Sequence, residues 1–503
     1  MPSFCQVQLR STETARGFAQ SAALAFLLTA AACQDATRTV APSAPALGPG
    51  ADRASAANTP GVFVLRGTVV TPTGVLANGY VGVMNGRIVS VSDKQPDLPN
   101  ALAVNVDGII VPGFVDVHNH LPWNVLPRWR PPRLYQDRYQ WRVDPDFLRR
   151  VQIPFDNLIG DENSPDSRVC DMNAYSEMRA LVGGVTSIMA THAVPCIRGL
   201  VRNLDYNSGF YGTSQLNLER IVSAIEIPPP SDPGARAIFV GQAQFAIAVP
   251  YFEGLFLHIS EGVDASSLEE FTFGQANGLL CSKCSAIHGI ALGPSQFQAM
   301  AAAGTSLVWS PVSNVNLYGQ TADINAALDA GVRIALAPDW AISGSSNILD
   351  ELHFADQWNR DHLGGRLSDR RLVDMVTSTP AAMAGIDDEV GAIRAGLRAD
   401  LVIINGNPNN ALRAVIEAGP ADVQLVLIEG VPLYGDRNFM QRFWAGGELE
   451  EIDLPGGPKV LASGSAGFVF DDVVRRLVPA LAGQGTSLAP LVEFGGEKKK
   501  KRR

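Results

Sequence analysis

Short apolar runs typical of buried strands alternate with helical segments through the middle of this 503-residue chain. Such alternation predicts parallel strands joined by helices, and eight units of this kind close into a barrel. The third strand is assigned to Arg220–Ile227, and no run is assigned to the fourth. The other strand-like runs are Phe114–Val117, Val185–Ala190, Gly254–Ile259, Ser285–His288, Ser306–Trp309 and Val332–Ala337, and the helical runs between the last three are Pro294–Ala303 and Ile324–Ala330.

Further strand-like segments flank this region on both sides. Val62–Val70 and Tyr80–Val91 are β-branched and alternating, the second around an Asn85-Gly86 turn, which predicts a hairpin. After residue 390, short strands recur without helices of proper length between them. The fold class is therefore α/β, a (β/α)₈ TIM barrel with a small β-sandwich domain built from both flanks. The expected division is 1–32 signal peptide, 33–60 flexible linker, 61–111 with 391–436 composite β-domain, 112–390 barrel, and 437–503 C-terminal extension with a basic tail.

Composition and charge exclude several classes of protein. With 46% hydrophobic residues, the chain can bury a core and is not intrinsically disordered. The formal net charge of -10 argues against a nucleic-acid partner, which normally meets a basic face. Basic residues do cluster at the end, over Lys498–Arg503, where they either attract anionic lipid weakly or have no role.

The N-terminus is typical of an export signal. Arg10 and Arg16 precede an apolar segment centred on Ala22–Leu28, and small residues then lead to Cys33. This order resembles a bacterial lipoprotein signal, with a lipid on Cys33 as the membrane anchor; the alternative is an ordinary cleaved signal. Gln34 favours the outer membrane over the inner one. The expected location is therefore the bacterial periplasm, as an outer-membrane lipoprotein, and the sequence leaves open whether the chain forms a homo-oligomer.

Four cysteines remain in the mature chain besides Cys33: Cys170, Cys196, Cys281 and Cys284. In an oxidising compartment they could form two bridges. Cys281 and Cys284 form a CxxC motif without a second copy, so a zinc ribbon is disfavoured. A local disulfide and two inert thiols both remain open.

Histidine and aspartate residues stand at the ends of several predicted strands. His118 and His120 follow the first barrel strand, His258 and His288 end two others, and Asp339 follows the last. A single histidine of this kind is usually structural, but such placement at several strand ends is improbable by chance. The carboxyl ends of parallel strands meet at one mouth of a barrel, where the active sites of this fold lie.

Imidazole and carboxylate groups from separate strands can form a rigid cage with one open position for water around a zinc-like ion. Glu261 adds a carboxylate three residues after His258. At that position it can shuttle protons between a bound water and a leaving nitrogen.

These residues lie in motifs that resemble the amidohydrolase superfamily, in its mononuclear branch with cytosine and guanine deaminases and triazine hydrolases. The resemblance runs from about residue 61 to 434. The resemblance implies that His118, His120, His258 and Asp339 bind the metal. It also implies catalytic roles for Glu261 as proton shuttle, for His288 on the water or oxyanion, and for Asp339 as proton acceptor. The motifs are Pro112–His120, His258–Gly262, Ile287–Gly289, Trp309–Asn314, Asp339–Trp340 with Ser343–Ser345, and Gly396–Leu401.

The segment from Leu121 to Asp171 is long and rich in Arg, Trp and Pro, and it resembles a lid. Its aromatic residues either form apolar walls for a substrate or simply cover the barrel mouth; they are Trp123, Trp129, Tyr135 and Trp141. His192 either lines the pocket or lies on the surface. His353 and His362 are expected to be structural.

The expected activity is that of a metal-dependent hydrolase acting on a small-molecule substrate. It would cleave a non-peptide carbon–nitrogen bond in a cyclic amide, amidine or aminoheterocycle by attack of metal-activated water. The alternatives are a peptidase-like enzyme for dipeptides or acyl-amino acids and a non-catalytic binding lipoprotein. The cofactor is expected to be one divalent ion, Zn²⁺ or else Fe²⁺.

The expectation of a single ion rests on the absence of a bridging group. No lysine lies between Lys94 and Lys283, so the carbamylated lysine that bridges two ions in dinuclear relatives is missing. The only acidic residue near a candidate fourth strand is Glu253, at the entry to the fifth.

Overall fold

Eight parallel strands line the centre of the chain in a computed structural model that describes residues 61–162, 164–189, 200–204, 221–248, 252–443, 449–463 and 468–493. The first three form one sheet and the last five another. An isolated parallel bridge between Asn119 and Asp339 connects the first strand to the last. Within the described residues no ladder joins the third strand to the fourth. The strands are β5 (Phe114–Asp116), β6 (Val185–Ile188), β7 (Arg202–Asn203), β8 (Ile221–Glu226), β9 (Phe252–Ile259), β10 (Cys284–His288), β11 (Ser306–Trp309) and β12 (Ile334–Leu336).

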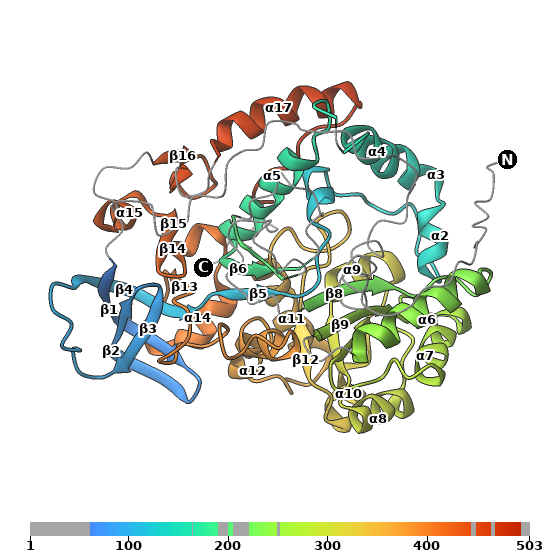
Figure 1. The fold of residues 1–503 in the computed structure, drawn as a ribbon, viewed down its shortest axis with the longest axis horizontal. Coiled ribbons are helices and arrows are strands. Elements are labelled where there is room, and N and C mark those ends of the chain that lie inside the picture. The colour runs from blue at the N-terminus through green and yellow to red at the C-terminus, as the bar shows by residue number, and fades with distance from the viewer. Residues whose placement is uncertain are drawn as a thin grey trace, which may run out of the picture.

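Helices follow the strands and cover the outside of the sheets, as Figure 1 shows for α6 to α8 beside β8 and β9. Local sequence fixes several helix ends. Asp264 accepts a hydrogen bond from Ser267 N at the start of α7, and Asp323 does the same for Ala326 N at the start of α10. Gly304 ends α8 in the left-handed conformation that glycine adopts easily. The helices are α5 (Val169–Val182), α6 (Pro233–Ala248), α7 (Ala265–Ala276), α8 (Pro294–Ala303), α9 (Pro311–Tyr318), α10 (Ile324–Ala330), α11 (Ile348–His362), α12 (Asp369–Asp374) and α13 (Ser378–Met383).

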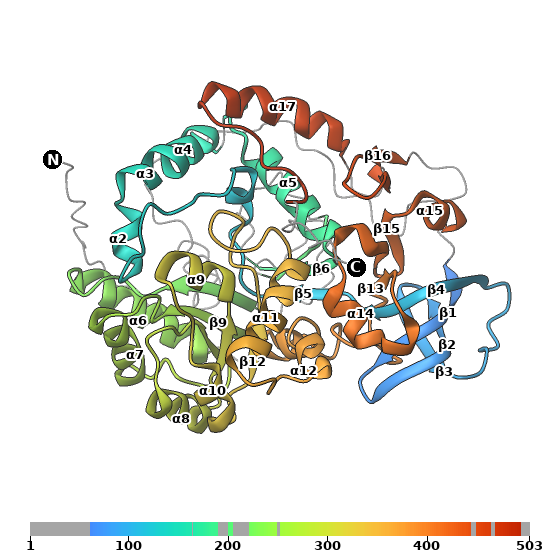
Figure 2. The ribbon, with the colours of Figure 1, turned by 180° about the vertical axis from the view of Figure 1, so that it is seen from behind.

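A nine-stranded sheet lies beside the barrel and combines strands from both flanks (Figure 2). The flanks meet where β13 pairs antiparallel with β4, placing Leu401 opposite Pro112. Asn85 and Gly86, both at positive φ, form the turn between β2 and β3. One hydrophobic core is shared by strands from the two flanks. The strands are β1 (Val62–Thr71), β2 (Gly74–Met84), β3 (Arg87–Ser92), β4 (Leu102–Pro112), β13 (Leu401–Ile404), β14 (Val423–Ile428), β15 (Val431–Gly435), β16 (Glu450–Ile452) and β17 (Lys459–Leu461).

The third strand was wrongly assigned from the sequence. β7 comprises only Arg202 and Asn203, and Arg220–Ile227 contains β8, which is the fourth strand. The sequence of β7 lacks the apolar residues typical of a buried strand. Its Arg202 is nevertheless buried, because it forms one ion pair with Asp400 and another with Glu429 at 2.9 Å. The nine-stranded sheet also continues past residue 436, through β17 pairing with β15.

Cysteine pairing is visible in part. Cys281 and Cys284 form a disulfide, so the expected local disulfide is present and the alternative of two inert thiols is wrong. Cys170 is also disulfide-bonded. Cys196, the N-terminal segment with Cys33, and the basic tail lie outside the described residues. Among the described helices, none combines the length and apolar character needed to cross a bilayer.

The long segment after β5 consists of short helices that lie over one end of the barrel (Figure 1). We call residues 121–160 the lid. Its elements are η2 (Leu121–Val125), α2 (Arg138–Arg142), α3 (Pro145–Phe147), η3 (Leu148–Gln152) and α4 (Ile153–Ile159).

Candidate active site

Three imidazoles and a carboxylate converge at the carboxyl ends of β5, β9 and β12. His118 Nε2 lies 3.1 Å from His258 Nε2 and 3.3 Å from Asp339 Oδ1. His120 Nε2 also lies 3.3 Å from Asp339 Oδ1. The structure therefore brings together the four residues that the sequence resemblance implied as metal ligands.

These distances fit a tetrahedral metal ion. Zinc–nitrogen bonds of about 2.0–2.1 Å place neighbouring tetrahedral ligands about 3.3 Å apart, close to the separations between the imidazole and carboxylate atoms. His118 Nδ1 lies 2.9 Å from Ser310 Oγ, and His258 Nδ1 lies 3.5 Å from the carbonyl oxygen of Ile225. Protons on both Nδ1 atoms leave the two Nε2 lone pairs facing each other, an arrangement that a cation between them stabilises. The donor set thus suits a divalent ion.

Burial sets the protonation state needed for metal binding. It lowers the pKa of His258 to about 3 and that of His118 well below its usual range, so both imidazoles are neutral at pH 7. Burial alone would raise the pKa of Asp339, but His118 and a hydrogen bond with His120 hold it below its usual range. Neutral imidazole and ionised carboxylate are the forms that bind metal ions.

Glu261 and His288 stand beside this cluster. Glu261 Oε2 lies 3.8 Å from His288 Nε2, and His288 Nδ1 lies 2.8 Å from Asn314 Oδ1. His288 also belongs to a second group of potential ligands, with His118 and Asp339. Both His288 and Asp339 adopt positive φ, at 71° and 69°. Non-glycine residues rarely adopt this conformation, and it concentrates at functional sites.

A cavity of about 320 Å³ opens above these residues. Its aromatic wall comprises two lid tryptophans, Trp123 and Trp141, with Phe147 and Trp340. Trp123 and Trp141 therefore form apolar walls, as one of the two explanations of the lid aromatics predicted. Trp129 and Tyr135 are buried and do not line the cavity, so the other explanation, a covering role, applies to them. The cavity is lined by His120, Trp123, Trp141, Arg142, Phe147, Gln152, Glu226, His258, Glu261, His288, Asp339 and Trp340.

Sequence reasoning missed a charged pair in the cavity wall. Glu226, at the end of β8, accepts two hydrogen bonds from the guanidinium of Arg142, at 2.5 and 2.7 Å. Although burial opposes it, the charge of Arg142 holds the pKa of Glu226 well below its usual range. The strand-end pattern that singled out the histidines would have found Glu226, had it been applied to Arg220–Ile227. Of the remaining histidines, His353 and His362 lie on α11, outside the cavity lining, and His192 lies outside the described residues.

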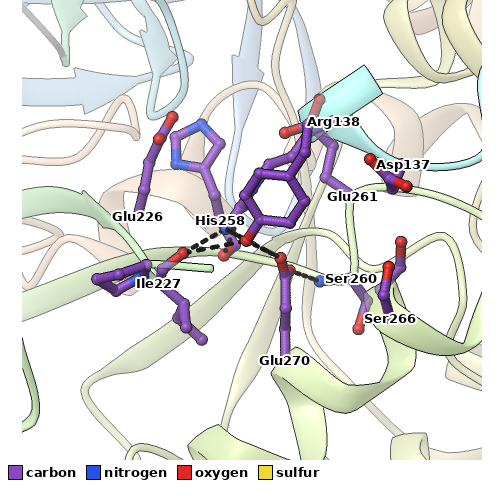
Figure 3. A network of polar contacts seen from close by, with 12 residues as sticks. Asp137, Arg138, Glu226, Ile227, His258, Ser260, Glu261, Ser266 and Glu270 are labelled. Carbon is purple, nitrogen blue, oxygen red and sulfur yellow. Dashed lines mark hydrogen bonds and ion pairs between the residues drawn. The ribbon is translucent and has the colours of Figure 1, made fainter. Parts of the chain in front are cut away.

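A buried network fixes the strand that carries His258 (Figure 3). The guanidinium of Arg138, on α2 of the lid, lies 3.0 Å from Glu270 Oε1 and donates to the carbonyl oxygens of Ile227 and His258 at 2.6 and 3.2 Å. Glu270 in turn accepts a hydrogen bond from Ser260 N at 2.9 Å. Arg138 and Glu270 were not identified from the sequence, because neither stands at a strand end.

Comparisons with known proteins find similar sequences. The sequence model of the amidohydrolase family matches residues 267–433. The 5-methylthioadenosine/S-adenosylhomocysteine deaminase of Caldicellulosiruptor saccharolyticus is 23% identical over 415 residues, covering 75% of this chain and 93% of the relative. The enzyme of the same name from Acetivibrio thermocellus is 22% identical, covering 71% and 89%.

Solved structures share the fold. A zinc-bound adenosine deaminase from Xanthomonas campestris has a TM-score of 0.54 at 20% identity, covering 78% of this chain and 94% of that one. E. coli guanine deaminase has a TM-score of 0.58 at 17% identity, covering 74% and 99%. A zinc complex of atrazine chlorohydrolase from Arthrobacter aurescens has a TM-score of 0.57 at 17% identity, covering 74% and 95%. The fold class and family resemblance expected from the sequence are thereby confirmed.

Proposed function

We propose that this chain, as a metal-dependent amidohydrolase acting on carbon–nitrogen bonds, deaminates an aromatic aminoheterocycle. The observation that carries this proposal is Glu261 beside a metal-binding cluster and under aromatic walls. Flat rings stack favourably on such walls. The relatives named as deaminases of adenosine derivatives favour an aminopurine among the possible substrates.

The reaction converts the amino-bearing ring carbon and water into a ring carbonyl and ammonia. A divalent ion held by His118, His120, His258 and Asp339 would supply Lewis-acid activation of the attacking water. We assign the remaining work to three side chains.

Asp339 takes a proton as water attacks, since its depressed pKa keeps it ionised beforehand. His288, which lies beside Glu261, His118 and Asp339, orients the water or donates to the developing oxyanion. Glu261 carries one proton of the attacking water to the departing amino nitrogen, so that ammonia leaves as a neutral molecule, and the proton taken by Asp339 ends on the ring nitrogen beside the new carbonyl.

We further propose one zinc ion per chain. The prediction from sequence was wrong in one point: Glu253 is not the only acidic residue near the fourth strand, because Glu226 ends that strand. Its two oxygens are, however, both engaged by Arg142, so it is poorly placed to bridge two ions. Without a bridging anion, two cations at short range would repel each other.

The test is ammonia release from a panel of aminopurines and aminopyrimidines, with dipeptides and cyclic amides as comparison substrates. The zinc-loaded protein should release ammonia from at least one aminoheterocycle, and a chelator should abolish the activity. Glu261→Gln should retain zinc but lose about a hundredfold or more in turnover. Release of amino acids from dipeptides alone would favour the peptidase-like alternative. Full metal loading without any hydrolysis would favour the binding lipoprotein.

We also propose that the protein is exported to the bacterial periplasm and anchored in the outer membrane by a lipid on Cys33. The N-terminal sequence supports this, and so do the disulfides at Cys281–Cys284 and Cys170, which are rare in reducing compartments. Mass spectrometry of the membrane fraction should find a chain that begins at Cys33 and carries a lipid. Cys33→Ala should release the protein from the membrane fraction, and an intact Met1 in the wild-type protein would contradict export.

A further inference from the structure

We propose that Tyr318 is a positioning residue for Glu261 and that it links Glu261 to the lid through Trp141. The proposal rests on the proposed function in one respect, the role of Glu261 as proton shuttle. Tyr318 ends α9, is buried, and does not line the cavity.

The hydrogen bonds around Tyr318 have a fixed direction. Trp141 Nε1 lies 2.8 Å from Tyr318 Oη, and Tyr318 Oη lies 2.7 Å from Glu261 Oε1. An indole nitrogen can only donate, so Tyr318 accepts from Trp141 and must give its single proton to Glu261. Burial, together with the charge of Glu261, raises the pKa of Tyr318 well above 10, which keeps this proton in place.

The two oxygens of Glu261 therefore have different tasks. Oε1 is held by Tyr318, while Oε2 points to His288 on the cavity side, at 3.8 Å from Nε2. A carboxylate held at one oxygen keeps the other in a single orientation. Such fixation matters because small misplacements of a reacting group cost large factors in rate.

The lid is also bound directly to the loop that carries Glu261. Arg138 N donates to the carbonyl oxygen of Glu261 at 3.2 Å, and Val263 N donates to that of Gln136 at 2.6 Å. Gly262 lies between them at φ 152°, and a Cβ there would come within 2.4 Å of the Gln136 oxygen. The glycine permits this close approach of the two backbones.

Trp141 extends this connection to the cavity, since its ring lines the cavity while its nitrogen donates to Tyr318. A substrate ring bound against Trp141 therefore contacts the first residue of a series of hydrogen bonds that runs through Tyr318 to Glu261. Contact of a substrate with Trp141 and orientation of Glu261 are thereby connected through the Tyr318 hydroxyl.

Tyr318→Phe removes the hydroxyl and keeps the ring. We expect kcat to fall roughly 10- to 100-fold, KM to change less than about threefold, and zinc content to stay at the wild-type value. Tyr135→Phe is the matched control, since Tyr135 is a buried tyrosine of the lid whose hydroxyl also bonds a carboxylate, Asp144 at 2.8 Å, away from the cavity. It should leave kcat unchanged.

A double-mutant cycle separates positioning from a general structural defect. If Tyr318 acts through Glu261, then Tyr318→Phe should have little further effect in a Glu261→Gln background. Equal losses in both backgrounds, or no loss of kcat in the single variant, would overturn the proposal.

Amide hydrogen exchange supplies a readout that needs no activity. Tyr318→Phe should speed exchange over residues 138–142 of the lid and leave α8 unchanged, whereas Tyr135→Phe should not speed it there. Unchanged exchange over 138–142 would refute the link to the lid. If the wild-type protein hydrolyses no substrate, the proposed function fails. The hydrogen-exchange experiment still decides in that case whether Tyr318 connects the lid to Glu261.

Discussion

Replacing Arg138 by methionine should destabilise the protein substantially, because it leaves Glu270 as a buried carboxylate without its cation. Both side chains are about 1% exposed, and the guanidinium lies 3.0 Å from Glu270 Oε1 (Figure 3). Methionine keeps most of the aliphatic volume, so the change removes chiefly the charge and the hydrogen bonds to the carbonyl groups of Ile227 and His258.

The expected cost follows from the burial of the pair. Removing one partner of a buried ion pair typically costs about 3–5 kcal/mol. Unfolding entropy is about 2.1 cal/mol/K per residue, or roughly 0.8 kcal/mol/K for a folded region of about 400 residues. A loss of about 4 kcal/mol should therefore lower the thermal midpoint by about 5 °C.

The assay is thermal unfolding of the zinc-loaded wild-type protein, Arg138→Met, Glu270→Gln and the double variant. The double variant should be more stable than the sum of the single losses predicts, because it leaves no unpaired charge. Arg366→Met is the control, since Arg366 pairs with Asp329 in an exposed bridge that should contribute little. An Arg138→Met shift no larger than that of Arg366→Met would refute the reasoning.

Three further predictions concern protonation and metal. Burial raises the pKa of Glu351 from 4.5 to about 8, so its contribution to stability is complete below pH 4.5 and is lost as the pH rises towards 8. The thermal midpoint of Glu351→Gln minus that of the wild type should therefore be larger at pH 8 than at pH 5. Parallel pH profiles for variant and wild type would contradict this. His288→Ala should keep its zinc while turnover falls about a hundredfold; loss of stoichiometric zinc would instead make His288 a ligand. Chelation should lower the thermal midpoint, because ion binding stabilises the folded state by about 4 kcal/mol at a thousandfold excess over Kd, and one equivalent of zinc should restore it. A stoichiometry near two would exclude the single-ion site.

Sequence patterns predicted those parts of the fold in which local signals and tertiary structure agree. The helices Pro294–Ala303 and Ile324–Ala330 and the strand Ser306–Trp309 occur with the expected bounds, since glycine caps and apolar periodicity mark them. Strand β7 was not predicted, because Arg202 is buried through an ion pair with Asp400, far along the chain. A long-range ion pair of this kind leaves no local pattern.

The site shows the same division. Residues at strand ends could be located because the barrel topology itself brings strand ends together. Tyr318 could not, since it ends a helix and approaches Glu261 only through packing of α9 beside the lid. Trp123 and Trp129 illustrate the limit further: both are lid tryptophans, yet only Trp123 lines the cavity, and the choice depends on how the short helices turn.

The nine-stranded sheet also imposes an order on folding. β4 must wait for β13, whose Leu401 pairs with Pro112, so about 290 residues are synthesised between the two partners. At roughly 5–20 residues per second, that delay is about 15–60 s. During this time one edge of β4 lacks its native partner, and an unpaired edge is a template for pairing with other chains. We therefore expect the nascent chain to depend on chaperones that shield β4 until the barrel and then β13 have been made.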